Sequence, residues 1–185
     1  METQSYTLSI FTENQIGLLH RITTVFTRRH INIISLTTSE SEIEGIYRFI
    51  IVINETEVNA KKLLKQIEKN IGVIKAYLLR EEDIVQQELA LYKVSTDNLA
   101  GGTFEKVIRD NHAHVLQIEP DYIMIEKTGL PSQTRTLLDA LQPYGVLGFS
   151  RSGIIAISKK PLHLRAYLEA AEKGHTRISQ NGQSH

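Results

Sequence analysis

The chain of 185 residues contains no cysteine, which excludes disulfides, thiolate metal sites and cysteine nucleophiles. It also carries no net charge, because 21 Lys and Arg residues balance 21 Asp and Glu residues. The strongly basic field that non-specific binding of nucleic acid or anionic membranes requires is therefore absent. We expect neither nucleic acid nor a membrane as a partner.

Long hydrophobic runs are absent as well. Each apolar run is interrupted within about eight residues, far short of the ~20 that a membrane-spanning helix needs. Residues 1–5 lack the basic and apolar regions of a signal peptide, so we expect the fold to begin near Tyr6. With the absence of cysteine, this favours a cytoplasmic protein.

What remains is an ordinary globular composition, with 41% hydrophobic and 23% charged residues. The length allows one or two small domains. Tyr6, Leu8 and Ile10 alternate with polar residues, as in a half-buried strand. Apolar residues then recur three and four apart, as in an amphipathic helix: Leu18, Leu19, Ile22, Val25 and Phe26.

Extended over the first half, these patterns predict the order βαββαβ. We expect strands over residues 6–12, 31–38, 45–53 and 73–79, and helices over residues 18–26 and 57–70. The strand over 45–53 is apolar on both faces, and only one can meet the helices. The other face is therefore expected to meet protein, which favours assembly.

The same patterns predict a repeat of this order in the second half. We expect strands over residues 88–95, 146–149 and 154–158, a hairpin over 115–127, and helices starting at Thr103 and Pro131. The predicted fold class is α+β, with two tandem ferredoxin-like βαββαβ domains. We place them at residues 4–80 and 86–160, joined over 80–85 and followed by a helical or disordered tail over 161–185.

The segment Glu13 to Leu19 is the most informative for function, because a strand passes into a helix there through a polar turn. Unpaired amides and the helix dipole at such a corner favour a small carboxylate. Gly17 would allow close approach, the amides of Gly17 and Leu18 could donate, and Asn14 could both donate and accept. Alternatively, Asn14 only caps the helix and Gly17 only relaxes the turn.

A second polar residue, Asn32, follows the first helix at the entry to the next strand. It could accept from a ligand ammonium group, or it could be an ordinary turn residue at a helix exit. The residues alone leave both interpretations open.

The stretch from Tyr6 through Leu36, with its loop Glu-Asn-x-x-Gly-x-Leu and its exit Asn32-Ile33-x-Ser35-Leu36, resembles the ACT domain of the acetolactate (acetohydroxyacid) synthase small, regulatory subunit. Arg151-Ser152-Gly153-Ile154 in the second half resembles the same family. The resemblance covers roughly residues 4–160. It implies that the N-terminal domain is an ACT domain.

The resemblance also implies a function. Small subunits of this family have no active site; they activate a catalytic subunit and confer feedback inhibition by valine or a related branched-chain amino acid. Thiamine diphosphate, Mg and FAD would be held only by that catalytic subunit. The effector would lie between two ACT domains of a homodimer, so that the implied effector-binding residues are Asn14, Ile16, Gly17, Leu18 and Leu19 of one chain, and Asn32 and Ile33 of its partner.

This sequence departs from the family pattern in two places. Leu18 stands where a small residue often follows the loop glycine, and its bulk would narrow the pocket. His30 stands where the family often has glycine at the helix exit, and it would be strained if that position keeps a positive φ.

Other candidate sites are weaker. His112 and His114 have the spacing of metal ligands on a strand, but no third ligand is evident. Gly101-Gly102-Thr103 lacks the lysine of a phosphate loop, and Ser150 and Ser152 lack an activating histidine. The lysines of the second helix are expected to form a solvated face, with a docking surface as the alternative.

Two alternatives to a regulatory subunit remain at this point. A free-standing ACT-domain sensor would bind amino acids on behalf of another enzyme or a transcriptional partner. A small ferredoxin-like enzyme would need a clustered acid–base pair, which the sequence does not show.

Overall fold

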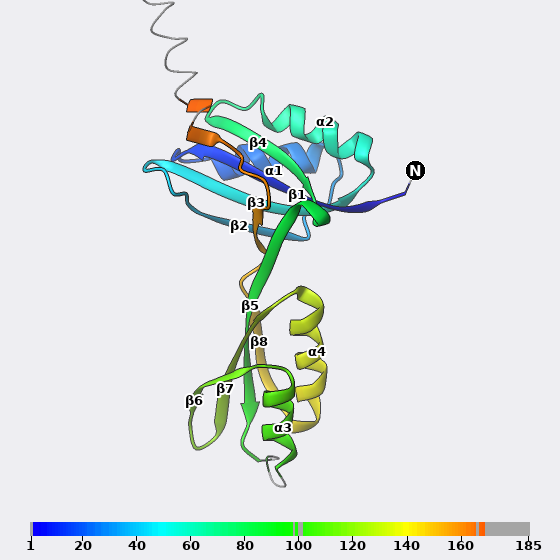
Figure 1. The fold of residues 1–185 in the computed structure, drawn as a ribbon, viewed down its shortest axis with the longest axis vertical. Helices are drawn as coiled ribbons and strands as arrows, with labels where there is room; N and C mark the ends of the chain where they lie inside the picture. The colour runs from blue at the N-terminus through cyan, green and yellow to red at the C-terminus, as the bar shows by residue number, and fades with distance from the viewer. Residues whose placement is uncertain (1, 98, 100–101, 166, 169–185) are drawn as a thin grey trace, which may run out of the picture.

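Four strands and two helices form the N-terminal lobe in the computed structural model, which describes residues 2–97, 99, 102–165 and 167–168 (Figure 1). The elements follow the predicted order: β1 (Gln4–Glu13), α1 (Leu18–Arg28), β2 (Ser35–Glu40), β3 (Ile46–Glu55), α2 (Glu57–Ile67) and β4 (Val73–Arg80). The sheet order is β2-β3-β1-β4, all antiparallel. This arrangement leaves β2 at one edge of the sheet.

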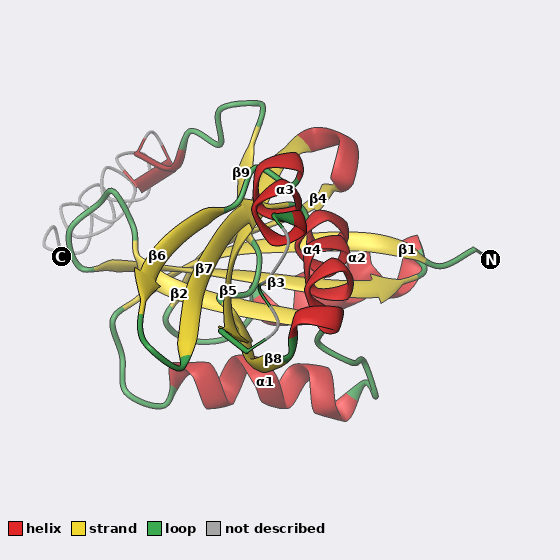
Figure 2. Cartoon of the chain, turned by 90° about the horizontal axis from the view of Figure 1, so that it is seen from below, coloured by secondary structure: helices red, strands yellow, loops and turns green. Residues whose placement is uncertain are grey.

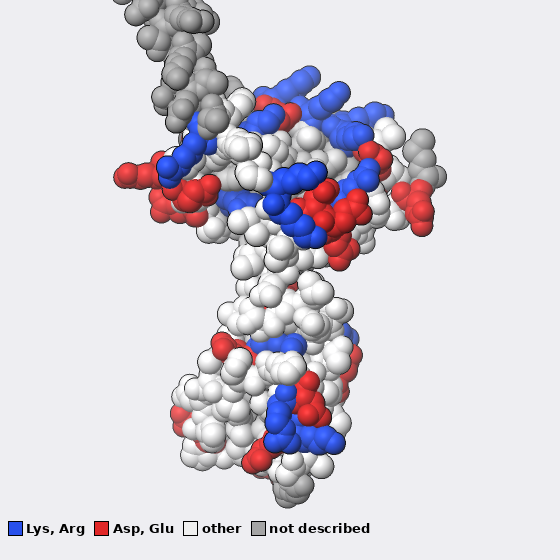
Figure 3. All heavy atoms as spheres, in the orientation of Figure 1, with Lys and Arg blue, Asp and Glu red and all other residues white. Residues whose placement is uncertain are grey.

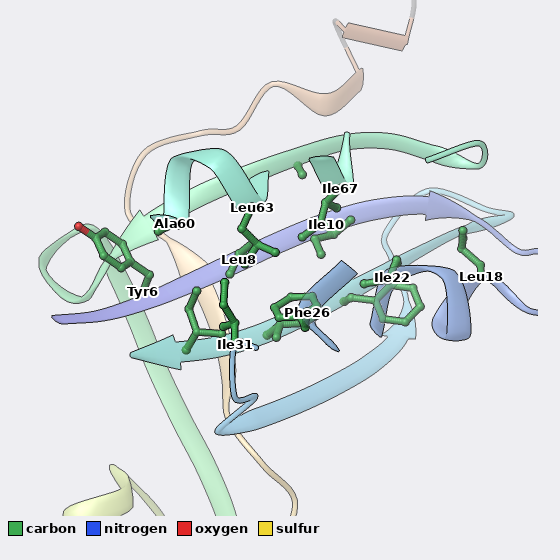
Figure 4. Packing of buried hydrophobic residues seen from close by; sticks show 14 residues of the cluster. Tyr6, Leu8, Ile10, Leu18, Ile22, Phe26, Ile31, Ala60, Leu63 and Ile67 are labelled. Carbon is green, nitrogen blue, oxygen red and sulfur yellow. The ribbon is translucent and has the colours of Figure 1, made fainter. Parts of the chain in front are cut away.

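The core of this lobe lies between the sheet and its two helices (Figure 4). Leu8 pairs with Ile51 of β3, and both are fully buried. Ile22 and Phe26 of α1 and Leu63 and Ile67 of α2 cover them from one side. The apolar spacing read from the sequence therefore selects the buried face of each helix.

The C-terminal lobe repeats the topology with β5 (Ile84–Ser95), α3 (Thr103–Asp110), β6 (His114–Ile118), β7 (Tyr122–Gly129), α4 (Pro131–Leu141) and β8 (Val146–Arg151). Its strand order β6-β7-β5-β8 is equivalent to that of the first lobe. Seen from below in Figure 2, α3 and α4 lie together on one side of this sheet. The α+β class and the two ferredoxin-like units are confirmed.

The connection between the lobes is shorter than the predicted joint over 80–85. Only Glu81–Asp83 form a 3-10 turn, and β5 begins at once with Ile84. β5 is long enough to pair with β7 and β8 through its second half, while its first residues pair with β9 (Ile155–Ser158). Figure 1 shows β5 running from the upper lobe into the lower one.

β9 corrects one prediction. The segment over 154–158 does not complete the second sheet, whose edge is β8; it returns to the first lobe instead. There Ile154 and Ala156 pack on Ile50 and Val52, on the face of β3 opposite the helices. The second apolar face of β3 is therefore covered largely by the same chain, and it no longer argues for assembly.

Two element boundaries also differ. The expected strand over 31–38 begins only at Ser35, because the amide of Ile31 still bonds to Phe26 O as part of the exit from α1. Of the expected helical or disordered tail over 161–185, only residues 161–165, 167 and 168 are described, and Leu164 is buried beside Phe11 and Ile46. The rest of the predicted tail lies outside the described residues.

Candidate functional site

The corner between β1 and α1 is open at its glycine. Gly17 precedes the first residue of α1 with φ +82°, a left-handed conformation that favours glycine. A Cβ built on Gly17 would meet no heavy atom within 4 Å. Asn14 is exposed in the same turn. A small molecule can therefore approach this backbone without displacing a side chain.

One of the two backbone amides expected to be free at the corner already has a hydrogen-bond partner. The N–H of Leu18 donates to Gln15 O at 3.2 Å, so it is used inside the turn. The N–H groups of Gly17, Leu19 and His20 have no hydrogen-bond partner among the described residues. The corner keeps unpaired donors of the kind that stabilise a carboxylate; Gly17 is among them as expected from the sequence, but Leu18 is not.

The apolar side chains at the corner point in different directions. Leu18 is 2% exposed and packs in the core of the lobe, so it neither narrows a pocket nor forms its wall in this chain. Ile16 is fully exposed and Leu19 is 45% exposed. Only Ile16 and Leu19 are therefore free to contact a ligand side chain or a second protein surface.

Arg21 and Gln15, which were not predicted from the sequence, also lie at this corner. Arg21 Nη2 donates to Gln15 Oε1 at 3.0 Å, and Gln15 Nε2 donates to Glu13 Oε2 at 2.5 Å. This chain of contacts holds a guanidinium beside the corner, where it adds positive charge for an anionic ligand. Arg21 lies four residues after Gly17, so their spacing on the helix was the available signal.

Thr12 was also missed. Its Oγ1 is buried and is the single such side-chain atom without a hydrogen-bond partner among the described residues. It lies at the end of β1, where the register to β4 shifts, directly before the corner. A buried hydroxyl without a partner is uncommon in native structures, and here it borders the candidate site.

The second group of predicted residues lies at the exit from α1. His30 has φ +54°, so the strain expected from the sequence is present. Asn32 is exposed and Ile33 is half-buried, just before β2. β2 pairs only with β3 among the described strands, so its outer edge is open to another strand.

One chain does not bring the two groups together. The corner with Asn14 and Gly17 precedes α1, whereas Asn32 and Ile33 follow it. Eleven helical residues rise ~16 Å. A small ligand that touches both groups would therefore require a second copy of the chain.

The motif Arg151-Ser152-Gly153-Ile154 joins the lobes at β2. The amide of Ile154 donates to Ser35 Oγ at 2.8 Å, and Thr37 Oγ1 donates to Ile154 O at 2.9 Å. Gly153, with φ +80°, approaches so closely that an added Cβ would lie 3.0 Å from Ser35 Oγ and from Thr37 Cγ2. We call these contacts of Gly153 and Ile154 with Ser35 and Thr37 the clasp.

Arg48 extends this connection to β3. Its Nη2 donates to Ala156 O at 3.0 Å, its Nε donates to Ser9 Oγ at 2.9 Å, and its guanidinium lies over the Phe11 ring. Burial lowers the pKa of Arg48 from its usual value, although an arginine stays charged in such surroundings. The charged Arg48 side chain thus holds β9 against the first sheet.

Arg151 itself reaches a buried group of the second lobe. Its Nη1 lies 3.4 Å from Glu88 Oε1, and Glu88 is 3% exposed. Thr134 Oγ1 donates to the same Glu88 oxygen at 2.5 Å. The hydroxyl of Tyr92 donates to Thr134 O at 2.7 Å; burial, together with the nearby Glu88, raises the pKa of Tyr92 and keeps it a neutral donor.

The weaker candidates gain no support. His114 faces Glu126 at 3.9 Å, and the described residues contain no group of three or more His, Cys, Asp and Glu side chains placed to hold a metal ion. Gly102 takes the left-handed conformation before α3, like Gly17 before α1. Lys and Arg side chains gather over α2 (Figure 3).

No helix in the described part of the chain has the length and apolar character needed to cross a membrane.

Comparisons with known proteins agree with both lobes. Residues 8–75 match the family model "AHAS small subunit-like ACT domain", and residues 87–160 match "Small subunit of acetolactate synthase". The chain is 33% identical to the acetolactate synthase small subunit of Mycolicibacterium smegmatis over 86% of its own length and 94% of that protein. It is 35% identical to that of Bacillus subtilis over 79% of this chain and 86% of the relative.

A solved structure supports the same assignment. The acetolactate synthase small subunit from Thermotoga maritima superposes with a TM-score of 0.78 at 25% identity, covering 86% of this chain and 99% of that one. The similarity extends over both lobes, as the family models do. The chain belongs to the acetolactate synthase small-subunit family.

Proposed function

We propose that this chain is the regulatory subunit of an acetolactate synthase, activating a separate catalytic subunit and making it sensitive to a branched-chain amino acid such as valine. Family membership supports a regulatory role in the holoenzyme. The proposal of effector binding rests on one observation: the predicted site residues fall into two groups that lie apart in one chain. Open donors lie at the β1–α1 corner, and Asn32 and Ile33 lie at the open edge strand, separated by the length of α1.

Two copies would complete the site. β2 can pair with β2 of a second chain, since edge strands extend sheets by antiparallel addition. A two-fold arrangement would bring the corner of one chain to Asn32 and Ile33 of the other, and would do so twice. The effector carboxylate would then meet the free amides near Gly17, with Arg21 adding positive charge, while Ile16 and Leu19 face its aliphatic side chain.

The clasp gives this site a physical route to the rest of the molecule. Effector binding at the β2 edge favours one position of β2, and Ser35 and Thr37 of β2 are bonded to the backbone of Ile154. A shift of β2 would therefore also displace β9 and the second lobe. A coupling free energy of about 1–3 kcal/mol would be typical of such transmission.

The chain's own part in this function is binding and transmission, not chemistry. We expect thiamine diphosphate, Mg and FAD to be held by the catalytic subunit. The test is a titration of the purified chain into its catalytic subunit at fixed substrate concentration, with and without valine. Turnover should rise to a plateau at a fixed ratio, and valine should lower that plateau.

The same titration separates the alternatives. A free-standing sensor would bind valine and leave acetolactate formation unchanged at every ratio. That outcome would remove the subunit role, whereas activation without any inhibition by branched-chain amino acids would remove only the effector part.

A further inference from the structure

We propose that the cleft between β2 and the C-terminal lobe is a second ligand site, which takes a small zwitterion: an α-amino acid with an aliphatic side chain. The cleft has a volume of about 300 Å³. Ile34 and Leu36 line it from the first lobe, and Glu88, Pro131 and Arg151 line it from the second. This proposal goes beyond the proposed function and does not depend on the β1–α1 corner.

Glu88 supplies a buried negative charge with spare capacity. Thr134 and Arg151 both reach Oε1, at 2.5 and 3.4 Å. Oε2 accepts no hydrogen bond from the described residues. A carboxylate that is 3% exposed and uses one oxygen can receive an ammonium group on the other.

Arg151 supplies the matching positive charge. Its side chain is 47% exposed, and its one ionic contact, to Glu88, is long and involves a single nitrogen. Arginine–carboxylate pairs normally close to about 2.7–2.9 Å and often form two parallel bonds. The guanidinium therefore keeps donors for the carboxylate of a ligand lying between Arg151 and Glu88.

The remaining lining is apolar or already bonded. Ser35 Oγ accepts from the amide of Ile154, and Ser152 Oγ accepts from the amide of Leu89 while donating to Gly153 O. Ile34 is an exposed apolar side chain and Leu36 is half-buried. An aliphatic side chain would cover this apolar wall and remove it from water.

Charge and size restrict the ligand further. Glu88 and Arg151 are the two charged residues in the lining, so the cleft is close to neutral and repels a polyanion through Glu88. Its volume lies at the lower end of the range for ligand pockets, which excludes a nucleotide. One positive and one negative group beside an apolar wall match a zwitterion.

The test is equilibrium dialysis of the full chain against radiolabelled L-leucine, on the Gly17→Asp background that disables the corner. We expect saturable binding of one leucine per chain. Arg151→Met and Glu88→Gln should each weaken it about tenfold or more, as expected when one member of a buried charge contact is removed. Arg135→Met, which removes an exposed charge of α4, is the matched control and should leave binding unchanged.

Two analogues test the zwitterion directly. Isocaproate lacks the ammonium group and isoamylamine lacks the carboxylate, so neither should displace leucine at concentrations where valine does. Because Glu88→Gln could unfold the second lobe, thermal unfolding is measured for each variant. If Glu88→Gln is unfolded, leucine binding by Arg151→Met alone tests the proposal.

The proposal is overturned if the Gly17→Asp chain shows no saturable leucine binding, if folded Arg151→Met binds as well as the parent, or if either analogue competes as well as valine. None of these outcomes bears on activation of the catalytic subunit, which is measured separately.

Discussion

At the scale of single residues, the two lobes share left-handed positions at equivalent points. Gly17 and Gly102 precede the first helix of each lobe, and His30 and His112 follow it with φ +54° and +50°. Glycine adopts this conformation freely, whereas an L-residue with a side chain is strained there. The histidines therefore carry a local cost that the surrounding fold offsets.

Relief of this strain gives the first prediction. His30→Gly should raise the free energy of unfolding by about 0.5–1 kcal/mol, because the strain removed exceeds the added freedom of the unfolded chain. Chemical denaturation of the purified chain measures it. His20→Gly, inside α1, is the matched control and should lower stability by about 1 kcal/mol; equal losses in both variants would show that His30 is unstrained.

The charge at the corner gives the second prediction. Gly17→Asp should abolish inhibition by valine while activation persists, because the new carboxylate would occupy the place of the ligand's own. Gly17→Asn has nearly the same shape and also tolerates the left-handed conformation. Inhibition assays of the reconstituted enzyme should show more residual inhibition with Asn than with Asp; equal behaviour would mean that bulk, not charge, disables the corner.

At the scale of elements, the clasp joins the edge strand of one lobe to the other lobe. It depends on Gly153, because any Cβ there meets Ser35 and Thr37 at 3.0 Å. Gly45 has a similar left-handed conformation, φ +76°, with nothing within 4 Å of an added Cβ. Comparing alanine substitutions at the two glycines therefore distinguishes the effect of backbone strain from the effect of losing the clasp.

Gly153→Ala should keep valine binding and weaken its effect on the catalytic subunit. Gly45→Ala bears the same kind of backbone strain but leaves the clasp intact, so it should retain normal inhibition. Calorimetric binding and inhibition of the reconstituted enzyme, measured on both variants, give the comparison. If Gly153→Ala inhibits as strongly as Gly45→Ala, the clasp does not transmit the effector.

The helices and strands also show how much of the fold could be predicted from the sequence. Periodicity placed both helices of the first lobe and the buried faces of Leu8 and Ile22, because spacing determines which side of an element faces the core. Periodicity also located the strand over 154–158, but not its place in the fold. Its partner, the start of β5, is fixed by long-range packing on Ile50, which no local pattern encodes.

The candidate site was predictable to a similar extent. The polar corner and its glycine followed from a strand, a turn and a helix in series. The burial of Leu18 and the use of its amide did not, since both depend on how the turn closes on Gln15. The position of Arg21 one helical turn after Gly17 was available from the sequence, but its contact with Gln15 was not.

At the scale of the whole molecule, two lobes are held by continuous structure and not by a loose linker. β5 belongs to both, and β9 returns the chain to the first sheet (Figure 1). The residues predicted to bind the effector nevertheless lie at the two ends of α1. The central claim is therefore that two copies complete each effector site.

Mixing two variants that have each lost valine inhibition tests this claim most directly. Gly17→Asp disables the corner and Asn32→Ala disables the strand edge, so each variant alone should activate the catalytic subunit without valine inhibition. Dimers that contain one of each retain one intact site, formed by the corner of the Asn32→Ala chain and the edge of the Gly17→Asp chain. Valine inhibition should reappear when the variants are unfolded and refolded together, whereas a mixture as insensitive as either variant alone would contradict the shared site.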